Sequence, residues 1–332
     1  MARILVTGCA GMIGSSLVRR LVQNGHEVKG VDNLWRGKLE NLRDNDRWII
    51  DMDRDFHNRD LSVPNQLDDL LDGIDYVYHL ADVVAGIGYV FANQLGIFRQ
   101  NLLINTHVVE SICKARSLKG YIYVGTACSF PQELQTGPDA PPLKEDDLYP
   151  ASPESAYGWS KLMGQYEAQL MEQDFAIPVC LPVLHNVYGS PCDFSPERSQ
   201  VIPSLIRRAI EYPKAGPFVV WGTGEQGRAF VHVSDVVDGL ILAMERGLGQ
   251  GVIQIGPDQC TTIRHAAETI VNISQKNIEI HFDETKPMGD LGRCADYGKA
   301  REVLGWEPKI SFADGMTWLY DWIEHQMTQG TN

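Results

Sequence analysis

Tyr157 and Lys161 are residues whose types and spacing could do chemistry, because they lie four positions apart on one face of a predicted helix. An ammonium group beside a phenol lowers the pKa of the phenol, so Tyr157 can exchange a proton with a hydroxyl group of a ligand. Thr126 follows a short apolar segment, 121–124, and its hydroxyl can hydrogen-bond the same ligand oxygen. These side chains predict an acid–base centre at which a hydroxyl group is oxidised or a carbonyl group is reduced.

Three glycines near the N-terminus predict a site for a dinucleotide. Gly8, Gly11 and Gly14 stand between a predicted strand, 3–7, and a predicted helix. Gly8 permits a tight turn, Gly11 lets the backbone approach a pyrophosphate, and Gly14 allows the helix to pack closely on the strand. The first N–H groups of the helix carry the positive end of its dipole and bind phosphates. The residues expected to provide them are Met12 and Ile13.

Acidic residues after the next two apolar segments predict how the adenosine part of the dinucleotide is held. Asp32 ends the second predicted strand, 28–31, where a carboxylate can accept both ribose hydroxyls and repels a 2′-phosphate. This position favours NAD over NADP, and we expect nearby Arg36 to be a solvated loop residue rather than a ligand of a 2′-phosphate. Further residues expected at the adenosine are Asn33, Asp60 and Leu61.

The elements that must position these residues alternate in type through the first half of the chain. The predicted strands are 3–7, 28–31, 76–80 and 121–124. Strands that alternate with helices indicate a parallel sheet covered on both faces, an α/β fold of the Rossmann-type doubly wound class. Prolines interrupt the alternation after about residue 180 and predict a smaller mixed α/β substrate-binding lobe. We expect an NAD-binding domain of 1–182 with 229–256, and a lobe of 183–228 with 257–332.

The composition argues against several classes of protein. The chain has 29 basic and 43 acidic residues and a net charge of −14, which disfavours non-specific binding to nucleic acid. No apolar run reaches the roughly 18 residues that a membrane helix needs, and the first residues have the pattern of a strand rather than of a signal peptide. The seven cysteines are scattered and contain no Cys-x-x-Cys pair. We therefore expect no disulfide framework, no metal site and a cytoplasmic location.

These residues, together with further motifs, resemble the extended short-chain dehydrogenase/reductase family of nucleotide-sugar enzymes. The motifs that carry the resemblance extend over nearly the whole chain: the glycine turn, Asp32, 79–81, Asn101, Thr126, Tyr157 with Lys161, 186–189 and 222–228. The resemblance implies an NAD-dependent homodimer. It also places Leu80, Ala81 and Asn101 at the cofactor, and it gives Tyr157 and Lys161 contacts with both cofactor and substrate.

Five segments are similar to the GDP-mannose 3,5-epimerases within this family, namely 81–90, 127–131, 185–189, 292–296 and 304–308. In those enzymes NAD⁺ oxidises C4 of the sugar, the neighbouring carbons become acidic, and a Cys/Lys pair inverts them before C4 is reduced again. The similarity implies that Cys128 is the cysteine base and that a GDP-sugar is the favoured substrate, with arginines on its diphosphate. The residues implied at the substrate are Gly86, Ile87, Gly88, Cys128, Asn186, Gln200, Arg228 and Arg293.

One position departs from this resemblance. The catalytic lysine of those enzymes falls on Gln200, whose amide cannot exchange a proton with a carbanion at pH 7. The sequence therefore leaves open a single inversion by Cys128, a nucleotide-sugar 4-epimerase, and a C4 dehydrogenase that oxidises without inversion. A 4,6-dehydratase is disfavoured, because Ala127 and Cys128 stand where that group has an Asp-Glu pair.

Structural roles compete with these catalytic ones. Cys128 could be a small packed side chain, as most free cysteines are, and Arg228 could form an ion pair with Asp235. A non-catalytic NAD-sensing Rossmann protein is the remote alternative to an enzyme. An intact acid–base centre argues against that alternative, because a sensor has no need of a proton relay.

Overall fold

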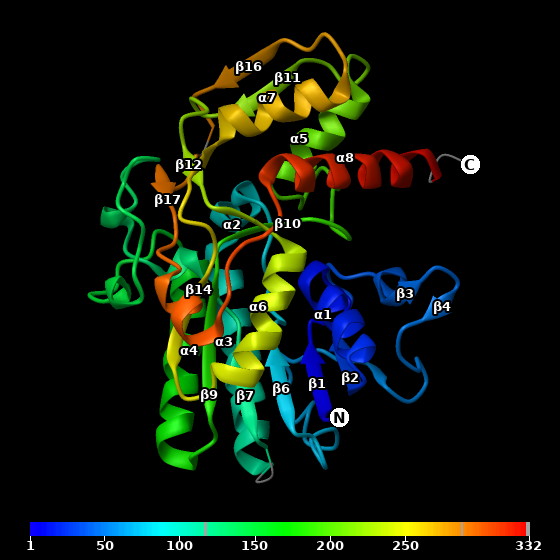
Figure 1. The fold of residues 1–332 in the computed structure, drawn as a ribbon, viewed down its shortest axis with the longest axis vertical. Helices are drawn as coiled ribbons and strands as arrows, with labels where there is room; N and C mark the ends of the chain where they lie inside the picture. The colour runs from blue at the N-terminus through cyan, green and yellow to red at the C-terminus, as the bar shows by residue number, and fades with distance from the viewer. Residues whose placement is uncertain (116–117, 287, 330–332) are drawn as a thin grey trace.

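An eight-stranded sheet forms the large body of the computed structural model, which describes residues 1–115, 118–286 and 288–329 (Figure 1). Residues 116–117, 287 and 330–332, which the two predicted domains include, lie outside that description. The strands of this sheet are β1 (Arg3–Thr7), β2 (Glu27–Asp32), β5 (Phe56–Asn58), β6 (Tyr76–His79), β7 (Gly120–Tyr123), β8 (Gly125–Thr126), β9 (Val179–Leu184) and β14 (Gly251–Ile255).

The strand order locates the functional edge of this sheet. The order is β14-β9-β7-β6-β1-β2-β5, with β8 paired to β9, and every pair is parallel. The chain proceeds from β1 outward to β2 and β5, and then returns to the other side of β1 with β6. In doubly wound sheets, ligands bind beyond the carboxyl ends of the strands at this reversal. The predicted fold class is confirmed, and the glycine turn after β1 lies at the reversal point.

Helices cover both faces of the sheet (Figure 1). α1 (Met12–Gln23) packs beside α6 (Val233–Arg246), and α3 (Gln94–Lys114) packs beside α4 (Ala156–Phe175) on the opposite face. Side chains alternate along β1, so Ile4 and Val6 join the core under α1 and α6, while Leu5 joins the core under α3 and α4. A strand buried on both faces needs an apolar residue at each position, which explains the continuous apolar run of β1.

The second lobe is built from shorter elements that pack on a separate apolar core. Its helices are α5 (Val201–Glu211), α7 (Ile263–Ser274) and α8 (Phe312–Gln329). Its strands form the parallel pairs β10 (Asn186–Tyr188) with β13 (Phe230–His232) and β11 (Phe218–Trp221) with β16 (Ile280–Asp283), and the three-stranded sheet of β15 (Thr261–Thr262), β12 (Gly227–Arg228) and β17 (Gly292–Arg293). The remaining elements are α2 (Ile87–Ala92), the hairpin β3 (Arg43–Asp44) with β4 (Arg47–Trp48), and short helical turns at Leu39–Leu42, Ala127–Ser129, Gln132–Leu134, Glu145–Leu148 and Ala300–Leu304.

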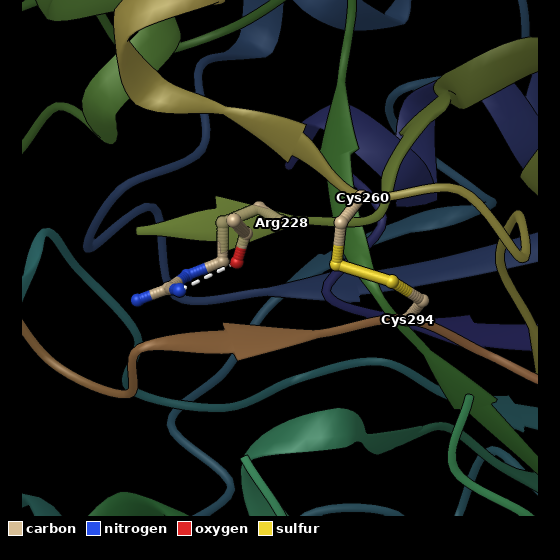
Figure 2. The surroundings of a disulfide bond; sticks show 4 residues. Arg228, Cys260 and Cys294 are labelled. Carbon is tan, nitrogen blue, oxygen red and sulfur yellow. Dashed lines mark hydrogen bonds between the residues drawn. A yellow bond between two sulfur atoms is a disulfide. The ribbon is translucent and has the colours of Figure 1, made fainter. Parts of the chain in front are cut away.

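A disulfide bond corrects the prediction from the cysteine pattern. Cys260 and Cys294, 34 positions apart, are joined with their Cα atoms 5.5 Å apart. Figure 2 shows the bond beside Arg228, whose strand β12 lies between β15 and β17. The expectation of no disulfide was wrong because strand pairing, which the spacing of cysteines does not reveal, brings the two residues together. The free cysteines are Cys9, Cys113, Cys128, Cys180 and Cys192.

Two features are absent from the described residues. None of their helices has the length and apolar character required to span a bilayer. Nor do they contain a cluster of three or more His, Cys, Asp or Glu side chains arranged to hold a metal ion.

Candidate active site

A cavity of about 700 Å³ lies at the carboxyl edge of the large sheet and is lined by residues of both bodies. The glycine turn and Asp32 line one part of it, and Tyr157, Cys128 and Arg228 line another. Of the residues predicted at the cofactor or the substrate, only Asp60 and Asn101 are absent from its wall. The fold thus gathers into one cavity residues that the sequence places far apart.

The glycine turn has the geometry that a dinucleotide requires. Gly8 has a φ of +69°, and a Cβ atom there would lie 2.9 Å from the backbone nitrogen of Ala81. A Cβ atom at Gly14 would lie 2.0 Å from the carbonyl oxygen of Gly8, so this position admits no side chain. α1 starts after Gly11 without a side-chain cap, which leaves its first N–H groups available to a pyrophosphate.

Asp32 is held in place by the backbone around it. Its Oδ2 accepts a hydrogen bond of 2.9 Å from the N–H of Ala10, and its Oδ1 accepts one of 2.7 Å from the N–H of Leu34. Burial raises the pKa of Asp32, and these two hydrogen bonds oppose the rise. Each oxygen keeps a second lone pair, so the carboxylate can still accept the hydroxyls of an adenosine ribose. These residues fit NAD.

Three residues considered for the cofactor site, two of them predicted to contact the cofactor, have local partners. Asp60 accepts hydrogen bonds from the N–H and the hydroxyl of Ser62, at 2.9 and 2.7 Å, and so closes its own turn. Asn101 is fully buried and is hydrogen-bonded to both backbone groups of Val83, so it supports the segment after β6. Arg36 is not a solvated loop residue as expected, because its Nη1 donates a hydrogen bond of 3.0 Å to the carbonyl oxygen of Val84.

Tyr157 and Lys161 meet at a carboxylate that the sequence analysis missed. The hydroxyl of Tyr157 donates a hydrogen bond of 3.0 Å to Oδ2 of Asp82, and Nζ of Lys161 lies 3.4 Å from the same oxygen. Both residues face this side because they lie in the first turns of α4, whose N-cap Ser155 accepts a hydrogen bond from the N–H of Gly158. The available signal for Asp82 was its place directly after β6, at the carboxyl edge of the sheet.

The electrostatics of this pair differ from the expectation. Burial raises the pKa of Tyr157 well above its usual value, and Asp82 raises it further. Burial lowers the pKa of Lys161, while the charge of Asp82 and its hydrogen bond raise it. The pKa of Tyr157 is thus raised rather than lowered as predicted, because burial and the Asp82 carboxylate both favour the neutral phenol.

Cys128 is placed between the acid–base centre and an arginine. It belongs to the short helical turn after β8, and its N–H donates a hydrogen bond of 3.3 Å to the hydroxyl of Thr126. Its Sγ receives a hydrogen bond of 3.2 Å from Nη2 of Arg293, and the residue is only partly buried. The thiol lines the cavity and contacts a cation, and it also packs against the apolar core under α3 and α4.

Arg228 and Arg293 face each other across paired positions of β12 and β17. Arg228 donates hydrogen bonds to the carbonyl oxygens of Gly227 and Met288, and burial followed by the charge of Arg293 lowers its pKa to about 10. The alternative ion pair with Asp235 is not formed, because the Asp235 carboxylate accepts hydrogen bonds from the backbone N–H groups of Lys309 and Ile310.

The remaining substrate residues line the cavity from two sides. Gly86 precedes α2, and its N–H donates a hydrogen bond of 3.2 Å to the carbonyl oxygen of Arg198, which ties α2 to the segment before α5. Ile87 and Gly88 begin α2. Gln200 is the N-cap residue of α5, and its side chain makes no capping hydrogen bond. Oδ1 of Asn186 is buried and has no hydrogen-bond partner among the described residues.

Comparisons with known proteins agree with this geometry. Residues 4–256 match the sequence pattern of the NAD dependent epimerase/dehydratase family. The chain is 30% identical to GDP-mannose 3,5-epimerase 1 of Oryza sativa subsp. japonica, a match that covers 99% of this chain and 85% of that protein. It is also 30% identical to GDP-L-fucose synthase 1 of Arabidopsis thaliana, with 97% and 93% covered.

Solved structures give the same result. UDP-glucose 4-epimerase of Thermotoga maritima, solved with UDP-glucose, superposes with a TM-score of 0.86 at 26% identity over 98% of this chain and 99% of that chain. UDP-glucuronic acid 4-epimerase of Bacillus cereus, solved with UDP-glucuronic acid and NAD, superposes with a TM-score of 0.82 at 27% identity, with 98% and 99% covered. The chain therefore belongs to the NAD dependent epimerase/dehydratase family, and it is an NAD-dependent enzyme of the extended short-chain dehydrogenase/reductase type.

Proposed function

We propose that this enzyme is a nucleotide-sugar epimerase that oxidises C4 transiently and inverts one neighbouring carbon of a GDP-sugar. The observation that carries the proposal is the hydrogen bond between Sγ of Cys128 and Nη2 of Arg293, in the cavity that also holds Tyr157 and Lys161. A 4-epimerase needs no such thiol. The similarity to the GDP-mannose 3,5-epimerases supports the choice of base and nucleotide.

One group of residues acts on the C4 hydroxyl oxygen of the sugar, and another acts on the neighbouring carbon. NAD, held by the glycine turn and Asp32, would supply hydride transfer to and from C4 of the sugar. Tyr157 takes the proton of the C4 hydroxyl, and Thr126 holds the same oxygen by a hydrogen bond. Tyr157 must be ionised to take this proton, and a phenolate has no proton to donate, so its hydrogen bond to Asp82 must be lost first.

Cys128 acts at a carbon beside the C4 ketone, where protons become acidic. The guanidinium of Arg293 donates a hydrogen bond to Sγ, so a positive charge lies beside the sulfur of the proposed base. Gln200 lines the cavity but cannot carry a proton to or from carbon. The double inversion of the 3,5-epimerases is therefore weak or absent here, and chemistry at a single centre is expected.

The substrate contacts follow from burial and charge. Arg228 makes hydrogen bonds only to carbonyl oxygens among the described residues, so its charge is available to a diphosphate. Arg293 donates hydrogen bonds to Cys128, Asp290 and Gln135, so its guanidinium belongs to the part of the cavity that holds the proposed base. The unpartnered Oδ1 of Asn186 can accept a hydroxyl of the same ligand.

A nucleotide-sugar 4-epimerase is the second candidate. The observation that favours it is the superposition on UDP-glucose 4-epimerase over 98% of this chain. In that reaction the keto sugar turns within the cavity and receives the hydride on its other face, without a carbon acid. A C4 dehydrogenase would use the same residues and release the oxidised sugar.

Assembly and location complete the proposal. We expect a homodimer formed by α3 and α4, which lie side by side on one face of the sheet (Figure 1) and expose the apolar side chains of Leu103, Trp159, Tyr166 and Leu170. Sedimentation at several protein concentrations tests this state.

We also propose a cytoplasmic location. The cysteine pattern no longer supports this location, because Cys260 and Cys294 form a disulfide. Fractionation of the source cells is therefore the test.

Incubation with a panel of nucleotide sugars in deuterated water tests the reaction. GDP-mannose that gains deuterium at C3 or C5 supports the proposed function. An epimer of any sugar of the panel that forms without solvent deuterium supports inversion at C4 instead. A released keto sugar with a stoichiometric amount of reduced cofactor supports the dehydrogenase.

A further inference from the structure

Two carboxyl groups meet in the wall of the cavity, outside the acid–base centre of Tyr157 and Lys161. Glu154 lies just before α4 and Asp290 lies just before β17, and both line the cavity. Oε2 of Glu154 lies 3.7 Å from the place of a Cβ atom built on Gly289, the neighbour of Asp290. Two neighbouring carboxyl groups repel each other when both are ionised, so such a pair favours a proton on one of its members, which the proposed chemistry has not used.

Arginine fixes which member of the pair is ionised. Asp290 is 5% exposed, and its Oδ2 lies 2.7 Å from Nη1 of Arg293, so Asp290 is the carboxylate. Its Oδ1 is buried and receives no hydrogen bond from a donor among the described residues. The neighbouring carboxyl of Glu154, when protonated, is the group that can donate to Asp290.

The surroundings of Glu154 match this assignment. Burial, followed by the charge of Asp290 and the hydrogen bond to it, raises the pKa of Glu154 to about 7, while Arg293 and Arg228 oppose the rise. A carboxyl group with a pKa near neutrality can both give and take a proton at physiological pH. Such a group differs from Gln200, which can do neither.

The carboxyl of Glu154 lies beside the residues assigned to the substrate. A Cβ atom built on Gly289 would lie 3.7 Å from Oε2 of Glu154 and 3.3 Å from Nη2 of Arg228. The same point lies 2.7 Å from Cδ1 of Ile87, in the substrate loop. Gly289 therefore marks a place where the carboxyl group, the diphosphate arginine and that loop converge.

Arg293 connects this carboxyl pair to the thiol. Its Nη2 donates to Sγ of Cys128 and its Nη1 donates to Asp290, so one planar guanidinium separates the thiol from the pair. Arg293 is 7% exposed, and its Nε has no hydrogen-bond partner among the described residues. Arg293 thus links the thiol directly to Asp290, and through Asp290 to the neighbouring carboxyl of Glu154.

We propose that Glu154 is the second proton-transfer group of this enzyme and that Asp290 is the residue that positions it. The assignment rests on the proposed function. Beside the C4 ketone, Cys128 thiolate removes the proton from the carbon, so an S–H bond forms and the electron pair of the C–H bond moves into the enolate. The enolate carbon then takes the proton of Glu154 on its other face, so a C–H bond forms, the O–H bond breaks, and Glu154 is left as a carboxylate. Exchange with solvent returns both groups to their starting states.

The first test uses GDP-mannose in deuterated water with the NAD-loaded enzyme. The wild type is expected to form an epimer that carries solvent deuterium at one carbon. Glu154→Gln should lower the rate of epimer formation by about 10²–10⁴-fold. The unreacted GDP-mannose should still gain deuterium at that carbon with its original configuration, because Cys128 can remove a proton and return one on the same face. Transient reduction of NAD should persist.

Asp290→Asn separates a positioning role from a structural one. Asn removes the negative charge that raises the pKa of Glu154, so that pKa falls. Epimer formation needs protonated Glu154, and the pH at which its rate declines should move to lower values, with the maximum rate kept within about tenfold. A loss of rate that is equal at every pH would contradict the positioning role.

Glu197→Gln is the matched control, because Glu197 is an exposed carboxylate that lines the cavity near Gln200. It should leave epimer formation unchanged. If Glu154→Gln formed the epimer at the wild-type rate, or if Glu197→Gln abolished it instead, Glu154 would lose the assigned role while the proposed function stood. If the wild type showed neither deuterium in GDP-mannose nor reduced cofactor, the proposed function would fail and this assignment with it.

Discussion

The hydroxyl of Tyr157 donates a hydrogen bond of 3.0 Å to Oδ2 of Asp82, the same oxygen that lies 3.4 Å from Nζ of Lys161. The phenol and the ammonium group of the acid–base centre are thus joined through a third side chain. Asp82 therefore contacts both partners, and its charge adds to the effect of burial on the pKa of Tyr157 and opposes the effect of burial on the pKa of Lys161. A tyrosinate that accepts a substrate proton has no proton to donate, so the hydrogen bond to Asp82 must be lost before that step.

Asp82→Asn tests this arrangement through pH dependence. Asp82 raises the pKa of Tyr157 and that of Lys161. Without its charge, Tyr157 ionises at lower pH, so the increase of hydride transfer with pH should begin at lower pH. The lost partner of buried Lys161 should also lower the free energy of unfolding by about 3 kcal/mol. Stopped-flow absorbance of the reduced cofactor across pH measures the first effect, and urea unfolding measures the second.

The outcome that contradicts this account is an unchanged pH profile with unchanged stability. Such a result would mean that the carboxylate leaves the pair in solution and contributes nothing to its ionisation. Thr126→Ser is a suitable control, because it keeps the hydroxyl that holds the substrate oxygen and should keep the wild-type pH profile.

Much of the cofactor side of this cavity could be predicted from the sequence, because its residues are close in the chain. The glycine turn joins β1 to α1 directly, and Tyr157 and Lys161 occupy one helix face by their spacing alone. Asp32 ends a strand adjacent to that turn. Local periodicity and turn chemistry determine these positions, and both can be read from the residues.

The substrate side depends on contacts between distant segments, which local patterns do not encode. Cys260 and Cys294 meet only because β15 and β17 flank β12. Glu154 and Asp290 come from different bodies of the fold, and no local sequence pattern predicts that their carboxyl groups are neighbours. The raised pKa of Tyr157 has a similar origin, since its burial and its contact with Asp82, in the segment after β6, both arise only in the folded chain.

Cofactor choice provides a second prediction. The Asp32 carboxylate should repel a 2′-phosphate, so the enzyme should bind NAD more tightly than NADP. Asp32→Asn keeps an oxygen that can accept a hydrogen bond from Ala10 or Leu34 and removes the charge, and it should narrow the ratio of the two dissociation constants by about tenfold. Fluorescence titration with both cofactors measures this ratio. Equal binding of NAD and NADP by the wild type would refute the assignment.

The disulfide should contribute measurable stability. A bond that closes a loop between residues 34 apart restricts the unfolded chain, for which the loop-entropy relation gives about 3–4 kcal/mol. The double variant Cys260→Ser/Cys294→Ser should unfold at lower urea concentration than the wild type. A reducing agent should destabilise the wild type and leave the double variant unaffected.

A count of the free thiols tests whether the disulfide forms in solution. The chain has seven cysteines, of which five are free in the structure, so the unfolded and unreduced protein should titrate five thiols. Seven reactive thiols would show that the bond does not form in solution. Cys113→Ser, which changes a free and partly exposed cysteine, is the control and should leave the effect of the reducing agent intact.

Gln200→Lys should add a second proton-transfer site. Gln200 lines the cavity and its side chain does not cap α5, so a lysine there has room to reach the sugar. With GDP-mannose in deuterated water, the variant should gain deuterium at a second carbon and form some doubly inverted product. Gln200→Met, of similar length and without an ionisable group, should gain neither. No new exchange in the lysine variant would show that position 200 does not face the reacting carbons.

The central claim is that Cys128 performs proton chemistry beside a carbon that NAD oxidises, and one measurement tests it most directly. Wild type, Cys128→Ser and Tyr157→Phe are each incubated with GDP-mannose in deuterated water, while deuterium at C3 and C5 is followed by NMR and reduced cofactor by absorbance. The account predicts exchange at one carbon in the wild type, loss of that exchange with hydride transfer kept in Cys128→Ser, and loss of both in Tyr157→Phe by about 10²–10⁴-fold. Unchanged exchange in Cys128→Ser would contradict the account.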